Sequence, residues 1–288
     1  MTISKAVASA DRIQDILEIK AGAEITPAEQ KNSEFRLEFD HVSLTYPNAA
    51  AESLTDIDFA VRPGETLGII GGTGSGKSSI VNLIPRFFDA TAGTVRIDGR
   101  DVRSYEPEEL RKKIGLVPQK AVLFKGTIRS NLLVADPEAD EETMWNALRT
   151  AQAEEVVRGK SGGLDAEVAQ EGRNFSGGQR QRLTIARALT RRPKILILDD
   201  SASALDYVTD KNLRHAIRVA DPGMTVVIVS QRTASVRFAN KIAVLDDGCL
   251  VGLGTHDELM QSCPVYQEIY DSQFKKEPDV KEDAENEN

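Results

Sequence analysis

Three short motifs in the chain place glycines, hydroxyl groups and carboxylates at spacings that suit phosphate chemistry. The first is the loop Gly71–Ser78, which reads Gly-Gly-Thr-Gly-Ser-Gly-Lys-Ser and fits the pattern G-x-x-x-x-G-K-[ST] without deviation. The second is the Ser-Gly-Gly-Gln turn at residues 176–179, and the third is the apolar run at 195–198 followed by two aspartates. Together the three motifs predict a site for nucleotide phosphates.

The glycine loop would hold phosphate mainly through its backbone. Its glycines let N–H groups converge on the β-phosphate, and a helix that starts after the loop adds a favourable dipole. In this motif the lysine, here Lys77, reaches the β- and γ-phosphates, and the next residue, Ser78, binds Mg²⁺. We therefore expect ATP and Mg²⁺ as ligands, with a chance glycine turn as the alternative. The residues expected to contact ATP are Gly72, Thr73, Gly74, Ser75, Gly76, Lys77, Ser78 and Ser79.

The two adjacent aspartates predict a metal position at the end of a buried strand. Asp199 follows four apolar residues, which is how such folds present a carboxylate to Mg²⁺. Two neighbouring carboxylates at a strand end repel each other unless a cation compensates them. The turn at 176–179 is weaker evidence by itself, because a Ser-Gly-Gly turn is usually only a helix cap. Its position about twenty residues before Asp199 gives it more weight.

The elements that must position these residues follow from apolar periodicity. Alternating segments at 35–39 and 42–46 slip by one residue at Asp40-His41, which predicts a β-bulge. A helix is expected over 77–88, with Ile80, Val81, Ile84 and Phe87 on its buried side. A helical block follows from about 125 to 190, clearest at 141–151 and 178–189. The other expected strands are 57–61, 66–70, 95–97, 114–117, 194–199, 225–230 and 241–246.

Continuous apolar strands that alternate with helices predict parallel strands covered on both faces, and the early alternating strands predict an antiparallel sheet at one side. The fold class is therefore α/β, a P-loop core with an antiparallel β-subdomain and an inserted α-helical subdomain. We expect an amphipathic helix over 4–19, with residues 1–33 as a connector, a main domain at 34–274 with its helical part at about 120–190, and a disordered acidic tail at 275–288.

Composition excludes several classes of protein. The net charge of −9 opposes a nucleic-acid binder that neutralises many phosphates, so no nucleic-acid partner is expected. Cys249 and Cys263 lack metal-ligand spacing and indicate incidental thiols. No apolar run approaches the ~20 residues of a membrane helix, and the start has no signal-peptide layout. We expect a soluble piece whose membrane role depends on a partner.

With these motifs in this order and spacing, the chain resembles the nucleotide-binding domain of ABC transporters over roughly residues 34–272. The glycine loop, the turn Phe175–Gln179, the strand ending at Asp200 and the run Ser203–Asp206 carry the match. In that family two such domains dimerise head to tail, and each ATP lies between one chain's phosphate loop and the other chain's signature turn. The resemblance implies that Ser176, Gly177, Gly178 and Gln179 contact the ATP of a partner domain.

The resemblance also implies roles for single residues. Tyr46 matches the aromatic that stacks on adenine, with a core tyrosine as the alternative. Gln119 matches the glutamine that contacts Mg²⁺ and senses the membrane domains, so the metal residues would be Ser78, Gln119 and Asp199; a solvated loop amide is the alternative. The run Leu123–Ile128 and the pair Glu171-Gly172 resemble the exporter branch, and the helix over 6–17 resembles the segment after the last membrane helix, with a plain surface helix as the alternative.

Two positions depart from the family pattern. The family usually has glutamate after the metal aspartate, where it polarises the attacking water; this chain has Asp200, whose carboxylate is one methylene shorter. The family also usually has a histidine at the γ-phosphate, whereas the matching stretch Val229–Arg232 carries Gln231, which cannot become cationic. The catalytic positions are thus Lys77, Asp200 and Gln231.

Both departures together resemble the degenerate half of heterodimeric ABC exporters. The implied function is an ATP-binding exporter domain at the cytoplasmic face of the cell membrane, which hydrolyses ATP weakly at its own site. The implied partners are transmembrane domains and a different nucleotide-binding domain that carries the usual glutamate and histidine. A competent homodimeric ATPase is the alternative. A soluble ABC ATPase acting on DNA or ribosomes is a third reading, which the exporter-like run at 123–128 opposes.

Overall fold

The computed structural model describes residues 10, 14, 25–27, 30–201 and 205–274. The expected helix at 4–19 falls almost entirely outside these residues, as do Ser203-Ala204 and the acidic tail at 275–288. The strands are β1 (Leu37–Leu44), β2 (Leu54–Val61), β3 (Thr66–Gly71), β4 (Ala92–Ile97), β5 (Arg100–Asp101), β6 (Ile114–Val117), β7 (Gly126–Thr127), β8 (Glu167–Val168), β9 (Ile195–Asp199), β10 (Thr225–Ser230), β11 (Lys241–Asp246) and β12 (Cys249–Gly254).

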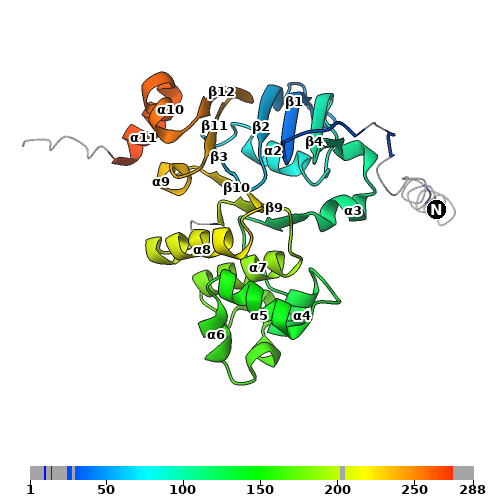
Figure 1. Ribbon diagram of the computed structural model, residues 1–288, viewed down its shortest axis with the longest axis vertical. Helices are drawn as coiled ribbons and strands as arrows, with labels where there is room; N and C mark the ends of the chain where they lie inside the picture. The colour runs from blue at the N-terminus through cyan, green and yellow to red at the C-terminus, as the bar shows by residue number, and fades with distance from the viewer. Residues whose placement is uncertain (1–9, 11–13, 15–24, 28–29, 202–204, 275–288) are drawn as a thin grey trace, which may run out of the picture.

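The helices alternate with these strands over most of the chain (Figure 1). They are α2 (Lys77–Leu83), α3 (Pro107–Lys112), α4 (Ile128–Leu133), α5 (Glu141–Thr150), α6 (Glu154–Arg158), α7 (Gly177–Thr190), α8 (Tyr207–Ala220), α9 (Thr233–Val236), α10 (His256–Ser262) and α11 (Pro264–Phe274). Among the described residues, no helix is both long enough and apolar enough to span a bilayer.

Within the described part of the chain, ten strands form one sheet in the order β5-β4-β1-β2-β12-β11-β3-β10-β9-β6. From β11 to β6 the neighbours run parallel, whereas β1 pairs antiparallel with both β2 and β4. This arrangement confirms the expected parallel core with an antiparallel β-subdomain. The register between β1 and β2 shifts between Phe39 and Val42, where the predicted bulge places His41 at φ 48°.

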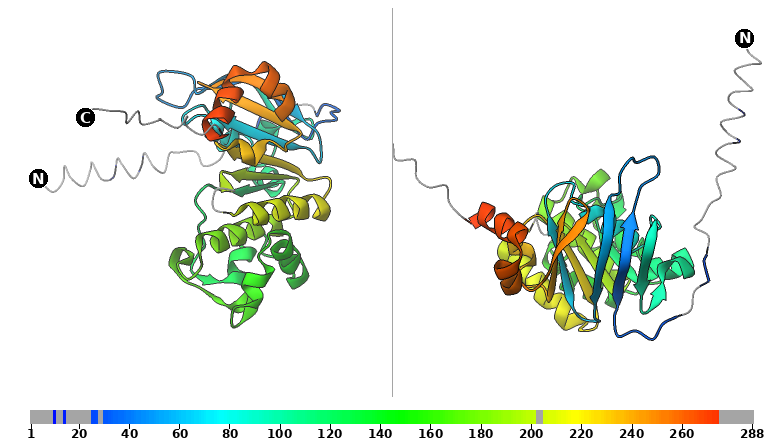
Figure 2. Two further views of the ribbon diagram at one scale, coloured as in Figure 1. Left: turned by 90° about the vertical axis from the view of Figure 1, so that its left-hand side faces the viewer. Right: turned by 90° about the horizontal axis from the view of Figure 1, so that it is seen from above.

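Alternation along the central strands divides the core into two clusters. Leu196 and Leu198 of β9 belong to the cluster that includes residues of α7 and α8, whereas Ile195 and Ile197 pack with Ile80 and Ile84 in and after α2. The helices α4 to α7 lie together at the end of the molecule away from the antiparallel strands (Figures 1 and 2). The sheet therefore has its two faces covered, as the continuous apolar runs predict.

One expectation about helix α2 is wrong. The predicted helix runs to residue 88 with Phe87 buried, but α2 ends at Leu83 and Phe87 is 47% exposed. Pro85 explains the early end, because proline has no backbone N–H to donate to the Val81 carbonyl oxygen and its ring crowds that carbonyl, while Ile84 before it still has helical backbone angles. Arg86 then adopts a positive φ of 54°, which turns the chain. The Phe87 ring is left beside Arg111, whose guanidinium carbon lies 5.4 Å from the centroid of that ring.

Candidate nucleotide site

Four neighbouring parallel strands, in the order β3-β10-β9-β6, bring most of the candidate residues to one edge of the sheet. The glycine loop follows β3, Gln231 follows β10, Asp199 and Asp200 end β9, and Gln119 comes two residues after β6. Because the strands run parallel, their carboxyl ends meet at the same edge, which is where open α/β sheets bind ligands. The topology thus gathers residues that lie up to 160 positions apart in sequence.

The glycine loop has the backbone geometry that its sequence requires. Gly74 and Gly76 adopt φ values of 83° and 97°, which favour glycine. A Cβ at Gly71 would lie 2.2 Å from the Leu245 carbonyl oxygen, so this glycine is needed for packing, whereas a Cβ at Gly72 or Gly74 would meet no atom within 4 Å. The outer face of the loop is therefore open enough for a ligand to approach its backbone.

Lys77 lies across this loop. Its Nζ donates hydrogen bonds to the carbonyl oxygens of Gly71 at 2.8 Å and of Gly72, and to Ser75 Oγ at 3.3 Å. Burial lowers the pKa of the Lys77 ammonium, and the carboxylates of Asp199 and Asp200 oppose that shift. The amine is thus placed between the loop and the two acidic residues, where it could contact phosphate oxygens.

The two aspartates differ in their surroundings. Burial raises the pKa of the Asp199 carboxyl, the neighbouring Asp200 raises it further, and Lys77 lowers it. The Asp200 backbone N–H donates to the Val229 carbonyl oxygen at 2.8 Å, and Asp200 holds a positive φ of 44°, which aspartate tolerates better than most residues. Gln119 Nε2 donates to Asp200 Oδ2 at 3.3 Å, so the structure joins the ends of β6 and β9 directly.

Gln231 lies on the loop between β10 and α9, and the last helix of the described chain holds this loop. Gln273 on α11 donates from Nε2 to the Gln231 carbonyl oxygen at 2.8 Å. Its Oε1 accepts from the backbone N–H of Thr233 at 2.9 Å and from Thr233 Oγ1 at 3.1 Å. Gln273 therefore fixes the backbone on both sides of Arg232 with two hydrogen bonds, and a third joins it to the Thr233 hydroxyl. Periodicity cannot reveal this contact, because it joins segments about forty residues apart.

Tyr46 lies against the start of helix α2. Its hydroxyl donates to Ser79 Oγ at 3.1 Å, and its ring meets Phe88 edge to face with centroids 4.8 Å apart. The side chain is half-buried at the margin of the core cluster that contains α2. An aromatic ring beside the phosphate loop is compatible with a base-stacking role and also with the simpler role of packing.

The turn Ser176–Gln179 opens helix α7. Ser176 Oγ accepts from the Gln179 N–H at 3.3 Å, and the Gln179 side chain accepts from the Ser176 N–H at 3.1 Å. This reciprocal capping box fixes the turn in shape. Gly177 lines a cavity of about 380 Å³ together with Gln119 and Glu171. The structure thus places the turn beside Gln119 and Glu171.

The residues present fit a magnesium nucleotide. Hydroxyl, amide and carboxylate oxygens from Ser78, Gln119 and Asp199 are the donors that Mg²⁺ prefers. A hollow of about 310 Å³ lies over residues 74–79, and its opposite side is formed by Glu52, Ser53, Asp247 and Gly248. Sequence reasoning missed these four flanking residues. The only signal for them is a pair of loops rich in small residues, which is too common to be informative.

Comparison with known proteins gives a consistent result. The family model described as ABC transporter matches residues 54–203. An uncharacterized ABC transporter ATP-binding protein of Mycobacterium bovis is 47% identical over 234 residues, which cover 80% of this chain and 40% of that protein. A putative multidrug export ATP-binding/permease protein of Staphylococcus aureus is 38% identical over 261 residues, covering 91% of this chain and 45% of that protein.

A solved structure of a bacterial Atm1-family ABC exporter with ATP bound superposes with a TM-score of 0.86 at 30% identity. The match covers 95% of this chain and 48% of that chain. The present chain thus spans about half the length of the relatives and of the structure that it matches.

Proposed function

The chain belongs to the ABC transporter family, and on that premise we propose that it is the ATP-binding domain of an exporter whose own ATP site hydrolyses slowly. The observation that carries this proposal is the shared edge of β3, β10, β9 and β6. This edge carries the complete G-x-x-x-x-G-K-[ST] loop and Asp199, but Asp200 and Gln231 stand at the positions where the family usually has glutamate and histidine. The relative described as a multidrug export protein and the Atm1-family structure support the exporter assignment.

In this proposal the phosphate loop and Lys77 bind and orient the triphosphate. Lys77 provides the positive charge at the β- and γ-phosphates, and Ser78, Gln119 and Asp199 would hold Mg²⁺. When bound, Mg²⁺ neutralises negative charge on the phosphate oxygens. Tyr46 would support the adenine, next to the Ser79 hydroxyl that it already contacts.

Slow hydrolysis follows from the positions of Asp200 and Gln231. The Asp200 carboxylate is one methylene shorter than that of glutamate, and Gln119 donates to one of its oxygens. Displacement of a reacting group by about 1 Å can cost on the order of 10²-fold in rate. Gln231 can donate a neutral hydrogen bond to a phosphate oxygen but brings no positive charge to it. ATP held here would act mainly as a long-lived ligand that favours the closed dimer.

The proposed partners are transmembrane domains and a second nucleotide-binding domain with glutamate and histidine at the matching positions. Two features support a membrane-domain contact at the cytoplasmic face. Gln119 and Glu171 line the same cavity, and the Glu171-Gly172 pair precedes the turn that would complete the partner's site. The capping box at Ser176–Gln179 supports a turn already shaped to meet the partner's ATP.

Steady-state ATP turnover tests the proposal. We expect wild type to bind ATP but to turn over slowly, and we expect Asp200→Glu combined with Gln231→His to raise kcat at least ~10-fold, since general-base contributions run to about 10²–10⁴-fold. ATP affinity should stay similar in both proteins. An ordinary turnover rate in the wild type, with little gain in the double variant, would instead support a competent homodimeric ATPase.

A further inference from the structure

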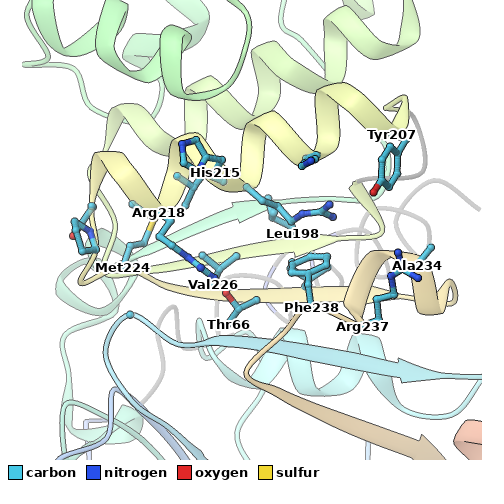
Figure 3. A pocket seen from close by; sticks show the side chains of 17 residues that line it. Thr66, Leu198, Tyr207, His215, Arg218, Met224, Val226, Ala234, Arg237 and Phe238 are labelled. Atoms are coloured by element: carbon cyan, nitrogen blue, oxygen red, sulfur yellow. The ribbon is translucent and has the colours of Figure 1, made fainter. Parts of the chain in front are cut away.

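A further cavity, of about 380 Å³, lies between helix α8 and the strands β9 and β10, away from the phosphate loop (Figure 3). Its floor is apolar and includes Leu198 of β9 with Val226 and Ile228 of β10, which are only 4–8% exposed. These three side chains belong to the core cluster on the α7 and α8 side of the sheet. We call this space the α8 cavity.

One wall of the α8 cavity is built as a fixed stack. The Arg214 guanidinium lies 3.7 Å from the centroid of the Phe238 ring and forms an ion pair with Asp210 one helical turn away. Asp210 and Arg214 are both mostly buried, so this charge is neutralised within the protein. Tyr207, which is 66% exposed, stands at the amino-terminal end of α8 (Figure 3). The wall thus offers aromatic and aliphatic surface without a free charge of its own.

The mouth of the cavity, in contrast, carries an excess of positive charge. Lys211 and Arg218 lie seven residues apart on α8 and so share one face of the helix, and Arg237 follows α9 on the opposite side of the opening. All three are exposed, and none forms an ion pair with another residue in the described ranges. Asp221 is the one acidic residue that lines the described cavity, and its Oδ1 already accepts from the Gly223 N–H at 2.9 Å.

We propose that the α8 cavity binds a small amphipathic organic anion, with its apolar body on Leu198, Val226 and Ile228 and its anionic group among Lys211, Arg218 and Arg237. The volume lies within the range of about 300–1,000 Å³ that is usual for small-molecule sites. An apolar floor with a few convergent polar groups is the usual construction of such sites. Charge complementarity selects an anion over a neutral or cationic molecule, because none of the three cations at the mouth has an acidic partner among the residues that the structure describes.

Decanoate is a suitable probe, with 1-decanol as its neutral counterpart of equal chain length. Binding is measured by displacement of the fluorescent aromatic sulfonate 8-anilinonaphthalene-1-sulfonate from the whole chain, below the micelle concentration of decanoate. We expect decanoate to displace the dye at least ten times more effectively than decanol. Equal displacement by the two compounds would overturn the proposal, since it would mean that the charges at the mouth contribute nothing.

Two variants locate the site. Arg218→Gln with Arg237→Gln should weaken decanoate binding about tenfold or more, whereas Lys125→Gln with Arg158→Gln removes the same charge from exposed positions elsewhere and should leave it unchanged. Ala234→Trp fills the opening from an exposed position on α9, keeps every charge, and should abolish binding. Thermal unfolding and ATP binding, both expected to match wild type, show that each variant is folded. Decanoate affinity that is unchanged in both the charge variant and Ala234→Trp would place the anion elsewhere and refute the proposal.

Discussion

Two helices begin at glycine-rich turns, and their N-termini differ in whether a side chain caps them. Helix α2 begins after Gly76, which has no side chain to cap it, whereas helix α7 begins after Ser176, whose hydroxyl and the Gln179 amide close a reciprocal capping box. The first backbone N–H groups of a helix need partners from outside the helix. At α2 the first two of these groups, on Lys77 and Ser78, are therefore available to an external anion, and the Ser79 N–H donates to the Gly76 carbonyl oxygen at 3.0 Å. At α7 the chain supplies part of the partner itself.

This difference suggests that the two turns have different roles in ATP binding. The phosphate loop relies on a ligand and on Lys77 to complete its hydrogen bonding, so its affinity for phosphate should be high. The turn Ser176–Gln179 is stable by itself and presents a fixed surface, which suits a contact made across a dimer interface.

Lys77→Ala should cause the largest loss. It removes the ammonium group that lies between the loop and the two aspartates, and a hydrogen bond to a charged group contributes about 1.5–3 kcal/mol, so ATP affinity should fall up to about 100-fold. Calorimetric titration with ATP and Mg²⁺ measures this. Lys125→Ala, an exposed lysine in the helical region, is the control and should bind ATP as wild type does. If Lys77→Ala kept full affinity, the loop would not be the main phosphate site.

Gly76→Ala should weaken ATP binding about tenfold. A side chain at φ 97° is strained by about 1–3 kcal/mol, and the new Cβ would lie 2.7 Å from Leu54 Cδ2 and 3.0 Å from the Ser53 carbonyl oxygen. The loop would have to shift, which displaces the open N-terminus of α2. Gly162→Ala is a matched control at φ 94° in the helical region, and it should lower stability while leaving ATP affinity intact. A similar loss of affinity in both variants would point to general destabilisation.

Ser176→Ala should act on stability and leave the chain's own ATP binding unchanged. Loss of a serine cap costs about 1 kcal/mol of unfolding free energy, which denaturant titration can resolve. Thr255→Ala removes an equivalent capping box from α10 and should cost a similar amount. The contrast between the two turns would fail if Ser176→Ala also weakened the binding of ATP to the isolated chain.

The pH dependence of Mg²⁺ binding should show the smallest effect. The pKa of Asp199 is raised, so on acidification this carboxyl takes up a proton sooner than an ordinary aspartate, and its neutral form holds a cation poorly. The Mg²⁺ concentration needed for half-maximal ATP binding should therefore increase as pH falls towards that raised pKa, and it should be lowest above it. Asp199→Asn should bind Mg²⁺ more weakly and lose this dependence. An equally pH-dependent Asn variant would assign the titration to another group.

Sequence reasoning was most effective where one physical rule governs a segment. The short apolar runs at 195–198 and 226–229 predicted the buried strands β9 and β10, and the positive φ values at Gly74 and Gly76 explain why the loop needs glycine there. It was wrong at Phe87, where one proline ends a helix that the apolar pattern would otherwise extend.

Contacts between segments that are distant in the chain could not be predicted from the sequence. The bond between Gln119 and Asp200 depends on the pairing of β6 with β9, and the α8 cavity depends on how closely α8 packs on the sheet. Neither the strand order nor the packing distance is encoded in any local pattern. The roles of Asp200 and Gln231 in turnover stay predictions.

The three hydrogen bonds of the Gln273 side chain, one donated and two accepted, have a practical consequence for following this protein in solution. They tie α11 to the backbone of the loop that carries Gln231, so a shift of that loop towards a bound triphosphate would be transmitted to the helix about forty residues later in the chain. A fluorescent dye on the exposed residue Ser272 or Phe274, paired with a second dye on the helical region, would then report nucleotide occupancy as a change in energy transfer. The Gln273→Ala variant of the labelled protein would keep the nucleotide site but lose the change in energy transfer. This variant is therefore the control for the measurement.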